Sequence, residues 1–163
     1  DNLRGDAGND TLTWNNGAGL NFALTYAIDA DYMITVTQAV SNGAPGAVAV
    51  KPFALINRTD KTASLDSYNV HSGPFGAFDG TVSFGPDYSD IAETGQVANA
   101  GKTDWVGFTD IYWMTALIPD KAGASSDFRA LGNGIFRADL VYAPVNVGAG
   151  QQSLRTTRLL DRR

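Results

Sequence analysis

The sequence predicts an all-β protein, an antiparallel β-sandwich with little helix. Alternate residues are apolar over two neighbouring stretches, residues 20–28 and 32–40, as expected of half-buried strands. Turn-forming pairs such as Asn16-Gly17, Asp79-Gly80 and Asn133-Gly134 separate the apolar stretches. No stretch shows the 3.6-residue periodicity of a long amphipathic helix. Roughly ten short strands joined by tight turns are typical of a sandwich.

The first half of the chain contains the clearest strands. Residues 12–14 are predicted to form a strand that ends at Asn16-Gly17. The stretches 20–28 and 32–40 form an antiparallel hairpin around a short acidic turn, because both alternate with period two and have similar lengths. Residues 48–57 are apolar on both faces, which predicts a central strand.

The second half is less regular. It is predicted to hold short strands at 67–70 and 78–84, one helical turn at 88–93, a polar loop at 94–103, and strands at 126–131, 135–142 and 153–159. Glycine and proline pairs such as Gly73-Pro74 are interpreted as turns between these strands.

Residues 105–120 form the densest apolar segment and contain two of the three tryptophans. Both alternating sets of side chains are mostly apolar, so the segment is interpreted as one central strand covered on both faces. Asp110 opens the strand and Pro119-Asp120 closes it, because proline has no amide hydrogen for a ladder. Trp113 is therefore predicted to be buried.

Composition limits the possible functions. The 163 residues suffice for one domain, predicted over 1–163 with a flexible leader at 1–10 and the chain end at 160–163. The net charge is −5, and the last nine residues hold four arginines against one aspartate, which leaves −8 on the rest. An acidic body argues against nucleic acid as a partner. There is no cysteine and no apolar run near the ~20 residues of a membrane helix.

The sequence contains no recognisable catalytic set. His71 is the only histidine, and one histidine cannot supply both the acid and the base of a mutarotase or anchor a zinc site; it is interpreted as a turn residue bonded to local backbone. The pairs Asp87 with Asp90 and Asp104 with Asp110 are interpreted as capping or solvated acids rather than a glycosidase pair. No enzymatic activity, metal or cofactor is therefore expected.

A few aromatic residues are candidates for contact with a partner, a peptide or a sugar in a cleft. Phe75 and Phe78 lie in a glycine-rich segment that favours exposure, and Trp105 follows a polar loop. Tyr68 belongs to the same set. These four residues are the predicted contact site.

Four segments in the right order resemble the periplasmic domain of the YidC family of membrane protein insertases. They are residues 12–17 (LTWNNG), 32–37 with 52–58 (YMITVT, PFALINR), 71–80 around HSGPFG and Asp79-Gly80, and 107–119 with Thr109-Asp110, Tyr112-Trp113 and ALIP. The resemblance extends from about Leu12 to about Arg158, so it covers most of the chain.

The resemblance implies a supersandwich similar to galactose mutarotase, forming a single domain or most of one. It implies an accessory role on the periplasmic side of the inner membrane of a Gram-negative bacterium, through contacts with Sec translocon components or nascent membrane proteins. The membrane helices of such a protein lie outside this sequence. Two alternatives remain open: a carbohydrate-binding or mutarotase-like module, and a calcium-dependent repeat fragment suggested by residues 5–12.

Overall fold

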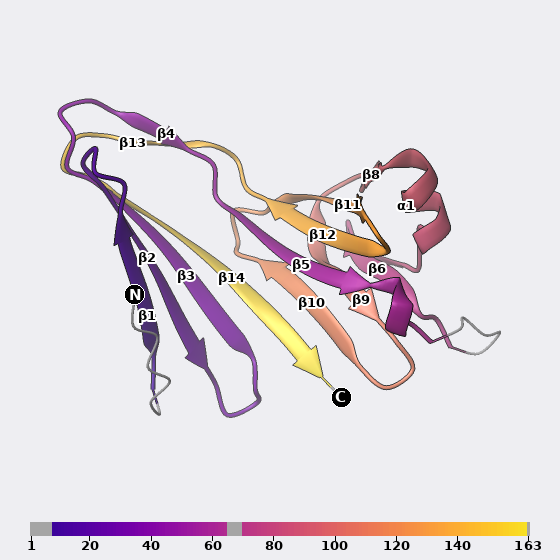
Figure 1. Cartoon of the computed structure of the whole chain (residues 1–163). Helices are drawn as coiled ribbons and strands as arrows, with labels where there is room; N and C mark the ends of the chain where they lie inside the picture. The colour runs from indigo at the N-terminus through magenta and orange to yellow at the C-terminus, as the bar shows by residue number, and fades with distance from the viewer. Residues whose placement is uncertain (1–7, 65–69, 163) are drawn as a thin grey trace. The chain divides into compact units, whose positions relative to one another are not determined.

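The computed structural model describes residues 8–64 and 70–162 (Figure 1). It is all-β with antiparallel sheets, as predicted. It divides into two compact units. Unit 1 consists of the residues up to Pro52 together with Ala143–Leu159, and unit 2 consists of Phe53–Tyr142 together with the residues from Leu160. The single domain over 1–163 stays a prediction, and residues 1–7 of the predicted leader lie outside the described residues.

Unit 1 is built on a sheet with the strand order β1-β2-β3-β14. These strands are Asp10–Asn15, Leu20–Ile28, Ile34–Asn42 and Gln152–Arg162. Two short strands, β4 (Val48–Val50) and β13 (Val145–Val147), pair with each other. The predicted turn after β1 is confirmed, and Asn16 N donates to Leu20 O across it at 3.1 Å. The predicted β2–β3 hairpin is confirmed as well.

The alternation predicted for β2 places the apolar residues on one face. Leu20, Phe22 and Leu24 lie on it. Phe22 lies opposite Trp14 on β1 and Val40 on β3, and Leu24 lies opposite Leu12 on β1. Trp14 on β1 stacks on Phe22, with ring centroids 5.1 Å apart. Tyr32, expected to begin the second strand, lies instead in the turn between β2 and β3.

Asn42 holds the end of β3 against the rest of unit 1. Its side chain is buried, and its amide donates to the carbonyls of Gly46 (2.7 Å) and Val147 (2.8 Å). Its carboxamide oxygen accepts from Ala44 N at 2.9 Å. Each of its side-chain polar groups is therefore satisfied, which a buried amide requires.

Unit 2 is a sandwich of two layers of four strands. One layer is the run β10-β9-β6-β7 of the eight-stranded sheet, and the other is the four-stranded sheet β5-β12-β11-β8. The first layer's strands are β10 (Met114–Pro119), β9 (Thr103–Thr109), β6 (Gly73–Phe78) and β7 (Thr81–Ser83). The second layer's are β5 (Phe53–Thr59), β12 (Ile135–Val141), β11 (Ser125–Gly132) and β8 (Gln96–Ala98).

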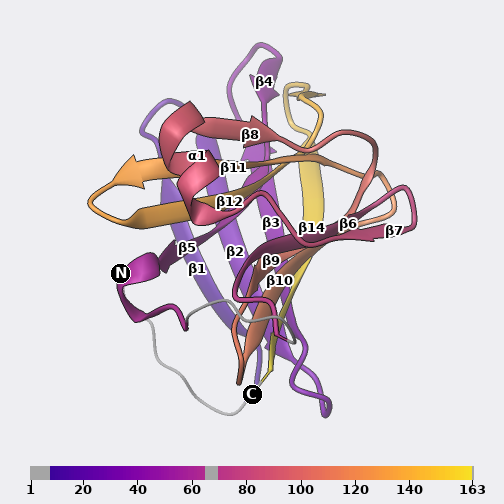
Figure 2. The same ribbon diagram turned by 90° about the vertical axis from the view of Figure 1, so that its right-hand side faces the viewer.

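Aromatic rings fill the space between the two layers of unit 2. Phe108 of β9 and Phe128 of β11 are fully buried and meet edge to face, with centroids 5.9 Å apart. Tyr88 opens α1 (Tyr88–Thr94) and packs against Phe108 and Phe136. The short helix lies beside β8 and β11 (Figure 2), and it confirms the predicted helical turn.

The interpretation of residues 105–120 as one strand is wrong. The segment is a hairpin, in which β9 and β10 pair antiparallel around the turn Asp110–Trp113, closed by Asp110 N donating to Trp113 O at 2.8 Å. The turn lacks glycine, proline and asparagine, and Asp110 is its one residue of a common turn type. Trp113 is half-buried rather than buried.

Other boundaries also differ from the prediction. Residues 48–57 are broken at Pro52 into β4 and β5, because proline cannot donate to a ladder. Gly73-Pro74 begins strand β6 instead of forming a turn. The loop predicted at 94–103 contains β8, and β13 was not predicted. The strand predicted at 67–70 falls mostly outside the described residues. Of the segment 5–12 suggested as a calcium repeat, residues 5–7 lie outside the described residues and residues 10–12 lie in β1.

The part of the chain that the structure describes contains one short α-helix and the 3₁₀ turn η1 (Asp60–Thr62). Neither has the length and apolar character that crossing a bilayer as a helix requires.

A substitution at Gly107 can test whether the backbones of β9 and β10 approach closely. A Cβ added there would overlap the Thr115 carbonyl oxygen and lie 2.8 Å from Ala116 Cα, both of them backbone atoms. Gly107→Ala should lower the free energy of unfolding by about 3 kcal/mol or more, because the backbone must shift. Gly46→Ala is the matched control, because nothing lies within 4 Å of its added Cβ. Equal denaturation midpoints for the two variants would contradict the β9–β10 packing.

A substitution at Tyr32 can test whether the backbone of the β2–β3 turn is strained. Its φ of 61° lies in the left-handed region, which a bulky side chain disfavours. Tyr32→Asn should raise the free energy of unfolding by about 1 kcal/mol, because asparagine tolerates this conformation. Tyr112→Asn is the control, since Tyr112 is also exposed but has no positive φ. The measurement is urea unfolding followed by circular dichroism, and a loss of stability in Tyr32→Asn would refute the strain.

Candidate contact site

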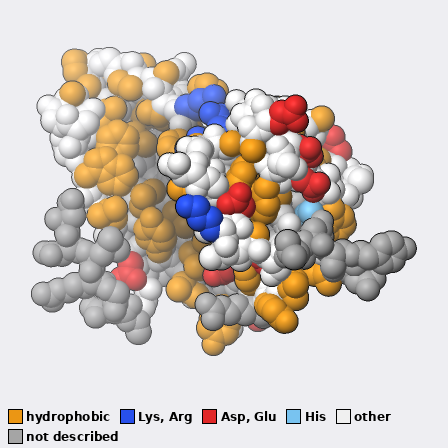
Figure 3. Space-filling model, turned by 45° about the vertical axis from the view of Figure 1, so that its right-hand side comes forward, with side chains coloured by type: hydrophobic (Ala, Val, Ile, Leu, Met, Phe, Trp, Pro, Cys, Tyr) orange, Lys and Arg blue, Asp and Glu red, His pale blue; other side chains and the backbone are white. Residues whose placement is uncertain are grey.

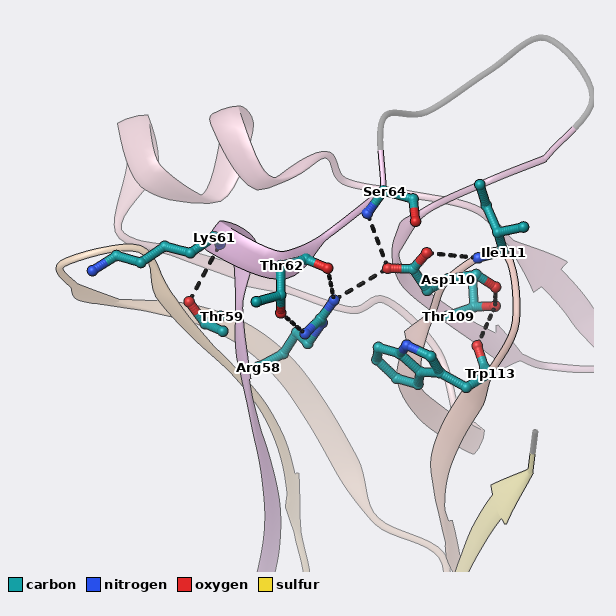
Figure 4. Close-up of polar contacts among 9 residues, drawn as sticks. All are labelled: Arg58, Thr59, Lys61, Thr62, Ser64, Thr109, Asp110, Ile111 and Trp113. Atoms are coloured by element: carbon teal, nitrogen blue, oxygen red, sulfur yellow. Dashed lines mark hydrogen bonds and ion pairs between the residues drawn. The ribbon is translucent and has the colours of Figure 1, made fainter.

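The β9–β10 turn is held by a buried carboxylate (Figure 4). Asp110 follows β9 and is 7% exposed. One carboxylate oxygen accepts from Ile111 N at 2.7 Å, within the turn, and the other accepts from Ser64 N at 3.1 Å. The second oxygen also lies 3.1 Å from Arg58 Nη2, in an ion pair. A single side chain thus ties the turn to two distant segments.

Arg58, near the end of β5, contacts three different groups. Besides Asp110, it donates to Thr62 Oγ1 (2.7 Å) and to the Thr62 carbonyl (3.1 Å). Its guanidinium carbon lies 4.6 Å from the centroid of the Trp113 ring, at the other end of the turn (Figure 4). This is a favourable cation–π arrangement. Arg58 therefore fixes both ends of the β9–β10 turn.

The network determines the ionisation of Asp110. Burial by itself raises the pKa of this carboxyl, and it is the largest single influence. Hydrogen bonds from the hydroxyl and amide of Ser64 and from Ile111 N, together with the charge of Arg58, outweigh burial and lower the pKa from 3.8 to about 2. The carboxylate is therefore charged throughout the physiological range.

The turn presents two apolar side chains to solvent. Ile111 is 42% exposed and Tyr112 is 80% exposed. A large side chain held on a fixed backbone suits contact with a partner, because little conformational freedom is lost on binding. Sequence reasoning missed these residues, because it placed them inside a strand. The available signal was Asp110, whose type commonly bonds to backbone amides in turns.

The four predicted contact residues lie in different surroundings. The exposure predicted for Phe75 is wrong: its side chain is buried, because it packs edge to face against the half-buried Trp105, with centroids 4.7 Å apart. Phe78 is half-buried and lies over Gly76, where an added Cβ would come within 2.6 Å of its ring. Tyr68 lies outside the described residues. The structure joins Phe75 with Trp105, and the contact role of the set stays a prediction.

The polar residues considered for catalysis have structural partners. His71 Nε2 lies 2.9 Å from the Pro74 carbonyl, as predicted for a residue bonded to local backbone. Asp90 accepts from Asp87 N at 3.1 Å at the start of α1, and Asp104 accepts from Gly80 N at 2.7 Å. Acidic side chains gather where α1 lies on the surface (Figure 3). Among the described residues, no group of three or more potential ligands is arranged to hold a metal.

A second charged network lies on the β11–β12 hairpin. Asp127 and Asp139 are opposite each other in the register, and both are almost buried. Arg129 donates to both carboxylate oxygens of Asp127 (2.7 and 3.1 Å) and pairs with Asp139 at 3.0 Å, and Arg137 also pairs with Asp139. Burial raises the pKa of Asp139, while Arg137 opposes the rise. Because the charges satisfy one another, this network joins two strands and offers no reactive group.

Comparison with solved structures defines the class of fold. The chain is similar to a galactose mutarotase-like protein from Lactobacillus casei, with a TM-score of 0.63 and 10% identity over 94% of this chain and 69% of that one. It is also similar to a putative aldose 1-epimerase from Escherichia coli K12, with a TM-score of 0.65 and 9% identity over 98% of this chain and 67% of that one. At these identities the likeness concerns the fold, a mutarotase-like β-sandwich, as predicted.

Sequence comparison identifies the family. Residues 4–160 match the family model described as YidC periplasmic domain, so the chain belongs to this family. Proteins named "Membrane protein insertase YidC" include one from Zymomonas mobilis, 36% identical over 91% of this chain and 28% of that protein. Another, from Granulibacter bethesdensis, is 38% identical over 91% of this chain and 28% of that protein. The chain therefore spans about a quarter of the length of these relatives.

The Asp110 network predicts a specific pH dependence of stability. A carboxylate whose pKa is lowered on folding stabilises the fold above its unfolded pKa of 3.8, and this contribution is lost as the pH falls towards 2. Asp110→Asn should lower the free energy of unfolding at pH 7 by at least about 2 kcal/mol. Its deficit relative to the unsubstituted chain should shrink between pH 5 and pH 2, because the native carboxyl then becomes neutral as well.

The measurement is urea unfolding of both proteins at a series of pH values. Asp161→Asn, which removes an equal charge from an exposed position on β14, is the control and should change the stability by less than ~0.5 kcal/mol. A deficit for Asp110→Asn that is the same at pH 7 and at pH 2.5 would show that the ion pair does not stabilise the turn.

Proposed function

We propose that this chain is the accessory domain of a membrane protein insertase. It acts on the periplasmic side of the bacterial inner membrane and works by contact rather than by catalysis. Its partners are components of the Sec translocon and nascent membrane proteins, engaged while the rest of the insertase performs insertion. The finding that carries the proposal is membership of the YidC periplasmic domain family, over residues 4–160.

The share of the relatives that the chain covers supports the accessory role. Relatives named membrane protein insertases are about four times as long as the matching region, which covers 26–28% of them. Insertion requires a route for polar groups across hydrocarbon, where each charge costs several kcal/mol. We assign that route to the remainder of the protein and assign recognition to this domain.

The braced turn at Ile111 and Tyr112 supports a contact role. Tyrosine combines a large apolar ring with a hydroxyl that can bond to a polar partner group, and it is enriched at interfaces. The Asp110 and Arg58 contacts hold the turn in one conformation before binding. We therefore place a partner contact at this turn.

A carbohydrate-binding module is the second candidate, and the mutarotase-like fold favours it. Titration calorimetry with glucose and galactose separates the two. We expect no heat of binding and no interconversion of anomers above background. Conversion that His71→Ala abolishes would favour the second candidate.

The accessory role predicts the outcome of reconstitution. The complete insertase in liposomes should insert a small membrane protein, and this chain alone should not exceed an unrelated β-sandwich protein. In the complete insertase, Gly107→Ala should reduce insertion by about twofold at most, provided that membrane levels match those of Gly46→Ala. Efficient insertion by the isolated chain would overturn the assignment.

The contact role predicts a position-dependent crosslink. A photoreactive residue replacing Tyr112 in the complete protein in living cells should give adducts with a translocon component or a nascent membrane protein, because the side chain is exposed on a fixed turn. The same residue replacing Lys121, which is also exposed and lies in the turn after β10, is the matched control. Equal adducts at both positions, or none at Tyr112, would refute a contact at this turn.

A further inference from the structure

The turn between β2 and β3 in unit 1 also presents apolar side chains to solvent. Tyr32 is 74% exposed and Ile28 is 65% exposed. The Asp29 carboxylate accepts from Asp31 N and Met33 N, both at 2.9 Å. Tyr32 N donates to the Asp29 carbonyl at 3.0 Å. The ring of Tyr32 therefore projects from a turn that has one defined conformation.

The positive φ of Tyr32 suggests that its side chain is kept for a contact outside the domain rather than for packing. Three non-glycine residues in the described part of the chain have positive φ: Tyr32, Asp79 and Asn133. Aspartate and asparagine tolerate this conformation, whereas tyrosine does so only against steric resistance. An exposed ring kept at a strained position contributes little to packing. Such strain is commonly retained at sites of interaction.

The register places this turn at one end of the unit 1 sheet. Ile28 lies opposite Ile34, which lies opposite Leu159 near the end of β14. An exposed aliphatic side chain and an exposed tyrosine at the same end of a hairpin suit the boundary between lipid headgroups and acyl chains, where tyrosine is enriched. Asp29 and Asp31 lie in the same turn, so attraction to anionic lipid does not explain a contact here.

We propose that the β2–β3 turn rests on the interfacial region of a phospholipid bilayer, with Tyr32 and Ile28 as its anchors. The inference rests on the proposed function, which places the chain beside a membrane. The apolar parts of both side chains enter the headgroup region, while the tyrosine hydroxyl and the acidic turn residues remain hydrated. The contact orients the domain relative to the bilayer and does not span it.

The absence of cysteine from the sequence allows a clean test. Ala30→Cys introduces one thiol at an exposed position in the turn, and this thiol takes a polarity-sensitive fluorophore. The labelled chain is titrated with vesicles of phosphatidylcholine alone and with vesicles that also contain about 30% of the anionic lipid phosphatidylglycerol. We expect the emission to shift to the blue with both lipids, and Tyr32→Ser to weaken the apparent partitioning about tenfold.

Leu154→Ser is the matched control, because Leu154 is 59% exposed in the same unit but lies within β14 rather than in the turn. It should leave partitioning unchanged, and Tyr32→Asn should weaken it although that variant is the more stable one. The proposal would be overturned if the emission did not shift with either lipid or shifted with anionic vesicles only. It would also be overturned if the Tyr32 variants partitioned as strongly as the labelled chain that retains Tyr32. The insertion and crosslinking assays do not depend on this turn, so they would still stand if it failed.

Discussion

The ion pair between Arg58 and Asp110 is the interaction on which the arrangement of unit 2 depends. Arg58 belongs to β5 in one sheet, and Asp110 follows β9 in the other. A buried carboxylate is strongly unfavourable unless charge and hydrogen bonds compensate it. The compensating groups come from both sheets and from Ser64, so the carboxylate is satisfied only when the two sheets and the intervening segment are in place.

The same chemistry gives both units their exposed turns. Asp29 and Asp110 each accept hydrogen bonds from backbone amides of the turn that follows. Because the aspartate closes the turn, the remaining turn positions can carry large apolar residues, which at Tyr32 carries a steric cost. Both turns carry a tyrosine that is at least 74% exposed. Isolated apolar residues at turns expose far less continuous surface than a bare sheet face does, which limits self-association.

Much of the fold could be predicted from the sequence, for reasons that are visible in particular residues. The β2–β3 hairpin follows from its period-two pattern, and the turn between β11 and β12 follows from Asn133-Gly134, whose φ angles of 55° and 72° such a turn requires. The β9–β10 turn was not predicted, because Asp110 alone is a weak local signal and two of the groups that hold its carboxylate, Arg58 and Ser64, lie more than 40 residues away. The apolar pattern of the sequence contains only local signals, so it predicted a single strand where the chain forms the β9–β10 hairpin.

The contact site was harder to predict than the fold for a related reason. Exposure of an aromatic residue depends on whether another strand covers it, and Phe75 and Tyr112 show the two outcomes. Phe75 follows glycine and proline but is covered by Trp105 across the β6–β9 pair. Tyr112 lies in the most apolar segment but is exposed, because the chain reverses there. Under the proposed function, the fold therefore separates two roles within one apolar segment: Phe108 and Leu117 pack the interior, and the residues at the reversal remain available to a partner.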